Sequence, residues 1–236
     1  DVTYSLETDC VNSESSQHIH IRSLRTNRVG IRQEQVYLPL HRESDYLLRL
    51  YVRSEGIEAI RLAVWDGQRE LARAELTGLD DKWRLYHGRW QICQPVARGA
   101  PLTVTITTDQ PGRIWLDQFF VFPADNIHGF DRDVVEFCRR ARLPLLRYPG
   151  GNFASGYHWQ DGIGPVDRRP MRRNPAWNCP EYNHVGTDEF MAFCEAVGCE
   201  PMICVNAGDG TPEEAAAWVE YCNGSVSYTH LTLPTN

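Results

Sequence analysis

The sequence has no apolar run that approaches the roughly 20 residues a membrane-spanning helix needs, so we expect no membrane partner. It also has no excess of positive charge: its formal net charge is -7 at pH 7. Nucleic-acid binding requires a basic face, and we therefore expect no nucleic-acid partner. Hydrophobic residues make up 42% and charged residues 23% of the 236 residues. This composition is typical of a folded globular chain with one large or two small domains.

The eight cysteines form no Cys-x-x-Cys pair. Cys194, Cys199 and Cys204 are each separated by four residues and have no histidines at ligand spacing, so we expect no metal site and no cofactor. Most cysteines lie among apolar neighbours, as thiols do in a reducing compartment, which slightly favours a cytoplasmic location. The chain starts at Asp1 without an apolar signal region, and we expect a mature form or a fragment.

The first half alternates with period two, which predicts strands that each bury one face. Three stretches show the pattern most clearly, with their apolar positions at Tyr46, Leu48, Leu50 and Val52, at Ile60, Leu62 and Val64, and at Leu102, Val104 and Ile106. The turn pairs Asp66-Gly67 and Pro111-Gly112 separate neighbouring runs. This pattern predicts a β-sandwich of the jelly-roll kind over residues 1–123.

The second part, residues 124–224, shows a different pattern, in which predicted helices alternate with short apolar strands. We predict helices over 131–142, from Thr187 as N-cap to Gly198, and from Thr211 to Gly224, with strands over 145–148 and 201–206. Alternating helices and strands with short links predict parallel α/β architecture, either doubly wound or a (β/α)₈ barrel. Residues 225–236 do not continue this alternation of helices and strands, and we predict a non-native or disordered tail there.

A long segment, residues 152–186, follows the first strand of the second part and is rich in Gly, Pro, Trp, Asp and Arg. Segments of this length are usually functional or disordered. In α/β barrels the catalytic and substrate-binding residues lie at the carboxyl ends of the strands and in the loops that follow them. In this chain these positions hold Gly151, Asn152, Tyr157, Trp159 and Asp161. Aromatic faces, amides and carboxylates suit a sugar ring and its hydroxyls.

Three stretches carry a family resemblance: LRYPGGNFASGYHWQDGIGPVDRRP, WNCPEYNHVGTDEF and EPMICVNAGDGTPEEAAAWVEYCN. Residues 120–224 resemble the second and third barrel strands of α-L-arabinofuranosidases of glycoside hydrolase family 51. The first half more weakly resembles the carbohydrate-binding-module-like sandwich that one branch of the family inserts after its first barrel strand. The chain is thus similar to the N-terminal part of such an enzyme, a β-sandwich followed by the first βα units of a (β/α)₈ TIM barrel.

The resemblance implies a retaining hydrolase that acts on terminal α-L-arabinofuranosyl groups of arabinoxylan, arabinan or their oligosaccharides, and that is a possible homo-oligomer when full length. It implies sugar contacts for Asn152 and Asn206, and it matches Trp159 to the loop tryptophan before an acidic pair. Gln160 stands where the resemblance implies Glu, which leaves the polar contact there in question. Together with Gly151, Tyr157 and Asp161, these are our predicted substrate-binding residues.

Neither catalytic carboxylate of the family has a counterpart here. Retaining chemistry uses two carboxyl groups ~5–5.5 Å apart, and the resemblance places the acid/base glutamate in an Asn-Glu pair, a dipeptide this chain does not contain. The family's first-strand Gly-x-x-x-Glu element is also missing. Asp161, Glu181 and Asp209 are the acids nearest the predicted ligand face, and we do not expect them to substitute. We therefore predict no catalytic residue in this chain and no activity for it alone.

Two other readings stay open at this stage. The sandwich could make the protein a non-catalytic carbohydrate-binding protein, with Trp65, Trp83, Trp90 and Trp115 as candidate sugar platforms. Alternatively, because family 51 also contains endoglucanases, the chain could be part of one of those. Retention on xylan or arabinan tests the first reading, and a comparison of aryl arabinofuranoside with β-glucan tests the second.

Overall fold

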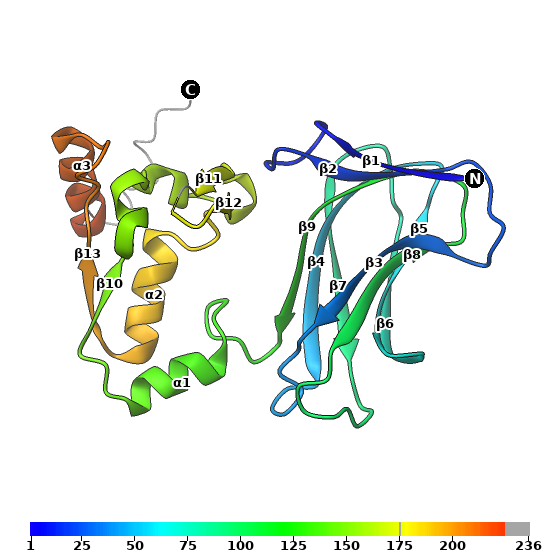
Figure 1. Ribbon diagram of the computed structural model, residues 1–236, viewed down its shortest axis with the longest axis horizontal. Helices are drawn as coiled ribbons and strands as arrows, with labels where there is room; N and C mark the ends of the chain where they lie inside the picture. The colour runs from blue at the N-terminus through cyan, green and yellow to red at the C-terminus, as the bar shows by residue number, and fades with distance from the viewer. Residues whose placement is uncertain (175, 225–236) are drawn as a thin grey trace. The chain divides into compact units, whose positions relative to one another are not determined.

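The computed structural model describes residues 1–174 and 176–224, and the chain folds as two compact units, one of residues 1–131 and one that begins at Arg132 (Figure 1). The predicted tail, 225–236, lies outside the described residues. Residues 124–131 follow the last sandwich strand and stay attached to the first unit. The Ala124 N–H donates to the Asp45 carbonyl at 2.8 Å, and Arg42 forms ion pairs with Asp125 and Asp131 at 2.7 Å.

The first unit is a sandwich of two antiparallel sheets (Figure 1). One sheet has five strands in the order β1 (Val2–Glu7), β2 (Ser16–Ile21), β9 (Gly112–Pro123), β4 (Asp45–Glu55) and β7 (Arg84–Gln91). The other has four, in the order β3 (Val29–Val36), β8 (Leu102–Thr108), β5 (Ala59–Asp66) and β6 (Arg69–Thr77). The predicted sandwich is confirmed.

The sandwich core forms where the period-two pattern predicted it. All ten of the apolar side chains used for the prediction are at most 6% exposed, and they pack into one cluster with Trp90 and residues from both sheets. Burying each such side chain stabilises the fold by about 1.5–3 kcal/mol relative to exposure. The expected turns at Asp66-Gly67 and Pro111-Gly112 connect β5 to β6 and β8 to β9.

The second unit pairs two short parallel strands, β10 (Leu145–Tyr148) and β13 (Glu200–Ile203), in register from Leu145 opposite Glu200 to Tyr148 opposite Ile203. Its helices are α1 (Arg132–Arg140), α2 (Thr187–Val197) and α3 (Pro212–Asn223). The long segment between β10 and α2 holds three 3₁₀ turns, Gly151–Gly156, Trp159–Gly162 and Val166–Arg168, and a small hairpin of β11 (Arg172–Asn174) and β12 (Cys179–Glu181).

Two local predictions in this unit needed correction. Helix α2 begins at Thr187, but its N-cap is Gly186, because the Thr187 hydroxyl accepts a hydrogen bond from the Trp218 indole at 2.9 Å. Strand β13 ends at Ile203, and Asn206 lies in the following turn. Thr211 caps α3 as predicted, since its hydroxyl accepts from the Glu214 N–H at 3.1 Å.

Candidate functional site in the second unit

The carboxyl ends of β10 and β13 lie at the same edge of their small sheet because the strands are parallel. The chain turns at this edge into Pro149-Gly150-Gly151 after β10 and into a Gly-Asp-Gly turn after β13. These two loops touch: a Cβ at Gly208 would lie 2.3 Å from the Ser155 carbonyl oxygen. Glycine at position 208 therefore allows the two strand-end loops to pack directly on each other.

A hollow of about 200 Å³ opens beside these loops. Ten residues line it: Asn152, Phe153, Gly156, Tyr157, His158, Asp161, Arg172, Arg173, Glu181 and Asn183. Three of the predicted site residues, Asn152, Tyr157 and Asp161, are therefore brought together here. The other three, Gly151, Trp159 and Asn206, are not part of this lining. The walls combine hydrogen-bonding groups of both charges with two aromatic rings.

Paired charges form one wall of the hollow. Asp161 accepts two hydrogen bonds from the Arg172 guanidinium, at 2.7 Å to Nε and 3.1 Å to Nη2. This contact raises the pKa of the Arg172 guanidinium above its usual value. The bidentate contact with Arg172 fixes the orientation of the Asp161 carboxylate, whose oxygens are hydrogen-bond acceptors.

Two tyrosines support the floor of the hollow. The Tyr148 hydroxyl lies 3.1 Å from the Tyr157 hydroxyl and 2.8 Å from the Val185 carbonyl oxygen. Burial raises the pKa of both Tyr148 and Tyr157, which keeps both protonated at neutral pH. Tyr157 lines the hollow but is only 3% exposed, because its ring packs in the core cluster of this unit.

Trp159 lies in the interior of the unit. It is 5% exposed, its ring stacks on Trp218 with centroids 6.1 Å apart, and its indole N–H donates to the Glu214 carbonyl at 3.1 Å. These contacts anchor the long segment to α3. A direct contact of Trp159 with substrate remains a prediction.

Asn206 is buried, at 8% exposed, and organises the turn after β13. Its amide donates to Asp209 Oδ1 at 2.7 Å, and its carbonyl oxygen accepts from the Gly208 N–H at 3.0 Å. Gly151 adopts φ +60°, a left-handed conformation that favours glycine, and leads the chain from β10 to the exposed Asn152. The sugar contacts predicted for these residues remain predictions.

A buried ion pair that the sequence analysis did not identify holds the long segment in place. Arg169 is 3% exposed and donates to both carboxylate oxygens of Glu189 at 2.8 and 2.9 Å. It also donates to the carbonyls of Gly164 and Asn183. Burial would raise the pKa of the Glu189 carboxyl, but hydrogen bonds from Arg169 and from the Gly186 N–H outweigh it and lower that pKa.

Among the described residues of this unit, Trp177 has the most exposed aromatic side chain, at 76%, and it lies between β11 and β12 in the small hairpin. Its backbone N–H and that of Ala176 donate to the Asn174 side-chain carbonyl at 3.1 and 3.0 Å. The backbone at the tip is thus fixed while the indole ring stays open to solvent. The sequence shows that Trp177 lies in the same aromatic-rich segment as Trp159. Residue type alone, however, did not predict that Trp177 is exposed and Trp159 is buried.

The tryptophan side chains of the sandwich are less exposed to solvent than Trp177. Trp90 is 0% exposed, and Trp115 is 5% exposed, stacked against His18 on one side and under the Arg53 guanidinium at 4.3 Å. The Trp65 indole N–H donates to the Thr105 hydroxyl and that of Trp83 donates to Asp9. None of the four has both an open ring and a free N–H.

The structure describes residues 1–174 and 176–224. These ranges contain no group of three or more His, Cys, Asp or Glu side chains placed to hold a metal ion. They also contain no helix that is both long and apolar enough to span a membrane.

The part of the chain that forms this site is similar in sequence to known proteins. Residues 139–232 match the model described as "Alpha-L-arabinofuranosidase 1 domain". A probable α-L-arabinofuranosidase C of Aspergillus fumigatus is 54% identical over 111 residues, which cover 47% of this chain and 22% of that protein. An intracellular exo-α-(1→5)-L-arabinofuranosidase of Halalkalibacterium halodurans is 46% identical over 101 residues, 43% of this chain and 20% of that protein.

One solved structure resembles most of the chain. The arabinose-bound MgGH51 α-L-arabinofuranosidase superposes with a TM-score of 0.77 at 17% identity, over 94% of this chain and 41% of that one, which shows a shared fold. The matched stretch spans about a fifth of the length of the curated relatives. Residues 139–232 are thus similar in sequence to the corresponding part of α-L-arabinofuranosidases.

Proposed function

We propose that this chain is part of a retaining α-L-arabinofuranosidase that removes terminal α-L-arabinofuranosyl groups from arabinoxylan, arabinan or their oligosaccharides. In this proposal β10 and β13 are neighbouring strands of a (β/α)₈ barrel whose carboxyl ends face the substrate. The observation that carries it is the hollow at those strand ends. It lies within the segment that is about half identical to proteins named arabinofuranosidases.

The lining of the hollow suits a pentose ring. Asn152 offers a donor and an acceptor, and Asp161 and Glu181 offer acceptors to hydroxyl groups. The rings of Phe153 and Tyr157 supply apolar contact beside them. A furanose presents hydroxyl groups on its rim and C–H bonds on its faces, which such a mixed wall matches.

Trp177 is proposed as an outer contact for the sugar chain. An indole that is 76% exposed on a fixed hairpin offers a flat apolar surface on which a sugar ring can stack. A sugar unit next to the arabinose would cover it.

We propose further that the chain does not hydrolyse arabinofuranosides by itself. Retaining hydrolysis needs one carboxyl group that donates a proton and a second that attacks the sugar. Asp161 is held by Arg172. Glu181 accepts hydrogen bonds from Asn174 at 3.4 Å and from the Asn183 N–H at 3.3 Å. These two carboxylates of the hollow are arranged to bind, and the catalytic pair belongs to parts of the barrel beyond β10 and β13.

The test uses the complete gene product with an aryl α-L-arabinofuranoside, an arabino-oligosaccharide and β-glucan as substrates. We expect hydrolysis of the two arabinosides and not of β-glucan. Trp177→Ala should lower kcat/KM on the oligosaccharide at least about tenfold, equivalent to ~1.4 kcal/mol. Tyr37→Ala, which removes an aromatic ring that is 64% exposed in the first unit, is the matched control and should change nothing. Faster hydrolysis of β-glucan, or an unaffected W177A enzyme, would overturn the proposal.

A further inference from the structure

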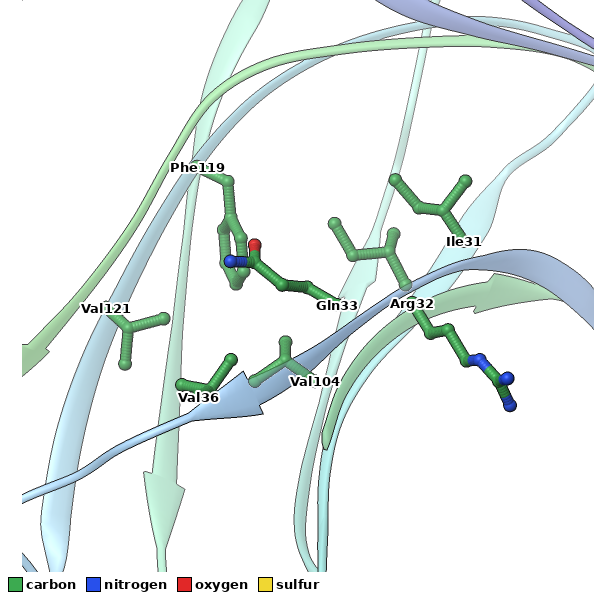
Figure 2. Close-up of a pocket in the computed structure, with 8 residues that line it drawn as sticks. Ile31, Arg32, Gln33, Val36, Val104, Phe119 and Val121 are labelled. Atoms are coloured by element: carbon green, nitrogen blue, oxygen red, sulfur yellow. The ribbon is translucent and has the colours of Figure 1, made fainter. Parts of the chain in front are cut away.

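The cysteines are reactive side chains that the proposed function does not use. All eight are free, and three of them, Cys194, Cys199 and Cys204, follow one another at intervals of five residues. The hollow of about 300 Å³ between β3, β8 and β9 of the sandwich (Figure 2) contains none of them, because its lining is mainly aliphatic around Phe119. The three evenly spaced cysteines lie instead at the end of α2 and along β13.

The backbone at the end of α2 folds Cys199 back toward Cys194. Gly198 ends the helix in the left-handed conformation, with φ +82°. The N–H groups of Gly198 and Cys199 both donate to the Cys194 carbonyl oxygen, at 2.8 and 3.1 Å. The bond from Cys199 spans six residues across a glycine, which is the Schellman arrangement, and in it the side chains of the first and last residues commonly contact each other. Those two residues here are both cysteines.

Cys199 and Cys204 have the same spacing, but the chain between them is extended because it forms β13. The Cys204 N–H donates to the Tyr148 carbonyl at 2.8 Å, which keeps the chain paired with β10 up to that residue. At ~3.3 Å per residue, five residues of strand span roughly 16 Å, whereas a disulfide joins Cα atoms at most ~7 Å apart. Of the two equally spaced pairs, Cys194–Cys199 is therefore the one that the fold brings together.

The two thiols differ in their access to solvent. Cys194 is 2% exposed, and burial together with a hydrogen bond to the Cys199 thiol raises the pKa of the Cys194 thiol. Cys194 is therefore protonated and unreactive toward reagents in solution. Cys199 is half-buried, so a reagent reaches its sulfur first. The pair thus combines an accessible thiol with a buried thiol next to it.

We propose that Cys194 and Cys199 form a reversible intramolecular disulfide when the protein meets an oxidised small disulfide such as glutathione disulfide. The Cys199 thiolate attacks one sulfur of the reagent and expels one glutathione thiolate, which leaves a mixed disulfide at Cys199. Cys194 then loses its proton to solvent, attacks the Cys199 sulfur and expels the second glutathione thiolate. Two protein thiols are oxidised to one disulfide, and one glutathione disulfide is reduced to two thiols.

This modification site is separate from the proposed sugar site. Cys199 lies just before the amino end of β13, whereas the hollow lies beside the loops at the carboxyl ends of β10 and β13. The disulfide ties the end of α2 to the start of β13, and excess reduced glutathione returns both thiols by the reverse exchange. The proposal does not depend on the function proposed above.

The test exposes the folded 236-residue chain to glutathione disulfide, unfolds it in N-ethylmaleimide to block the remaining thiols, and digests it after glutamate without reduction. Cleavage after Glu195 separates the two cysteines, so a Cys194–Cys199 disulfide holds two peptides together until a reductant is added. We expect mass spectrometry to find this linked pair. Cys204→Ser is the matched control, because it removes the equally spaced cysteine, and it should leave the linked pair unchanged.

Two further measurements test the order of the steps and the role of the fold. Cys194→Ala removes the second thiol and should leave at least tenfold more glutathione attached to Cys199 than the unchanged chain retains. In concentrated urea the two spacings are equivalent, so Cys199–Cys204 should form about as readily as Cys194–Cys199, whereas the folded chain should favour Cys194–Cys199 at least tenfold. Circular dichroism establishes that each variant is folded, and the unchanged chain carries the test if C194A is not.

Three results would overturn the proposal. The first is a folded chain that gains no linked pair, whether it stays reduced or keeps glutathione on Cys199. The second is a disulfide from Cys199 to Cys204 or to another cysteine in the folded chain. The third is an equal preference for the two pairs with and without urea, because the backbone at the end of α2 would then not be what joins them.

Discussion

The buried Arg169–Glu189 pair gives the sharpest prediction about the second unit. Arg169 donates five hydrogen bonds, to Glu189, Gly164 and Asn183, which tie the long segment to the start of α2. Arg169→Ala would leave the Glu189 carboxylate without its arginine partner. Removing one member of a buried ion pair typically costs ~3–5 kcal/mol. The Glu189 side chain is 23% exposed, so water reaches it, and we expect the lower end, about 3 kcal/mol.

The matched control is Arg172→Ala on the same segment. Arg172 also makes a bidentate contact, with Asp161, but its side chain is 61% exposed. Exposed pairs contribute ~1 kcal/mol or less. Both arginines make a bidentate contact with a carboxylate, but Arg169 is buried and also donates to the Gly164 and Asn183 carbonyls. The difference between the two variants therefore measures the effect of burial together with those extra hydrogen bonds.

Native-state hydrogen exchange of the full chain measures how much each substitution lowers the local stability around the pair. Amides of α2 and of residues 152–186 should exchange roughly a hundredfold faster in R169A, which corresponds to ~3 kcal/mol, and less than tenfold faster in R172A. Amides of the sandwich strands provide the internal reference and should not change. Equal acceleration in both variants, or none in R169A, would refute the reasoning that burial makes this pair important.

Three further outcomes follow from the structure of the second unit. The pKa of Glu189 is lowered on folding, so its contribution to stability is present above its ordinary value of 4.5 and is lost as pH falls below that value; urea midpoints measured from pH 7 to pH 3 should fall less in Glu189→Gln. Gly208→Ala should destabilise this unit, because the new Cβ would meet the Ser155 carbonyl at 2.3 Å, whereas Gly156→Ala meets nothing within 4 Å and should be tolerated; thermal melts compare them. Thr211→Ala should cost about 1 kcal/mol by loss of the α3 cap, and a cost near zero would show that the cap contributes nothing.

The parts of the fold that local patterns determine could be predicted from the sequence. Alternation of apolar and polar residues marked the sandwich strands because each buries one face, and Thr211 with the proline after it marked the start of α3. The β-bulges of β3 at Gln35 and of β9 at Gln118, where the register shifts against the neighbouring strand, had no such signal. They depend on how one strand meets its neighbour, and no short window of sequence encodes that.

The site was predicted less completely, for two physical reasons. Tryptophan serves equally as a core residue and as a sugar platform, so the sequence could not separate the buried Trp159 from the exposed Trp177. The Arg169–Glu189 pair joins residues 20 positions apart across the small β11–β12 hairpin, and pairing at that distance depends on the folded path of the chain. Asn152, Tyr157 and Asp161 were brought together as expected because the carboxyl end of a strand delivers them.

The most direct measurement compares two proteins on 4-nitrophenyl α-L-arabinofuranoside: the 236-residue chain and the complete product of its gene. The account predicts that the complete product releases nitrophenol and that the chain releases none above the buffer rate, although it is folded by circular dichroism. Turnover by the chain alone would contradict the claim that its carboxylates bind the sugar without cleaving it. An inactive complete product would contradict the assignment of arabinofuranosidase activity.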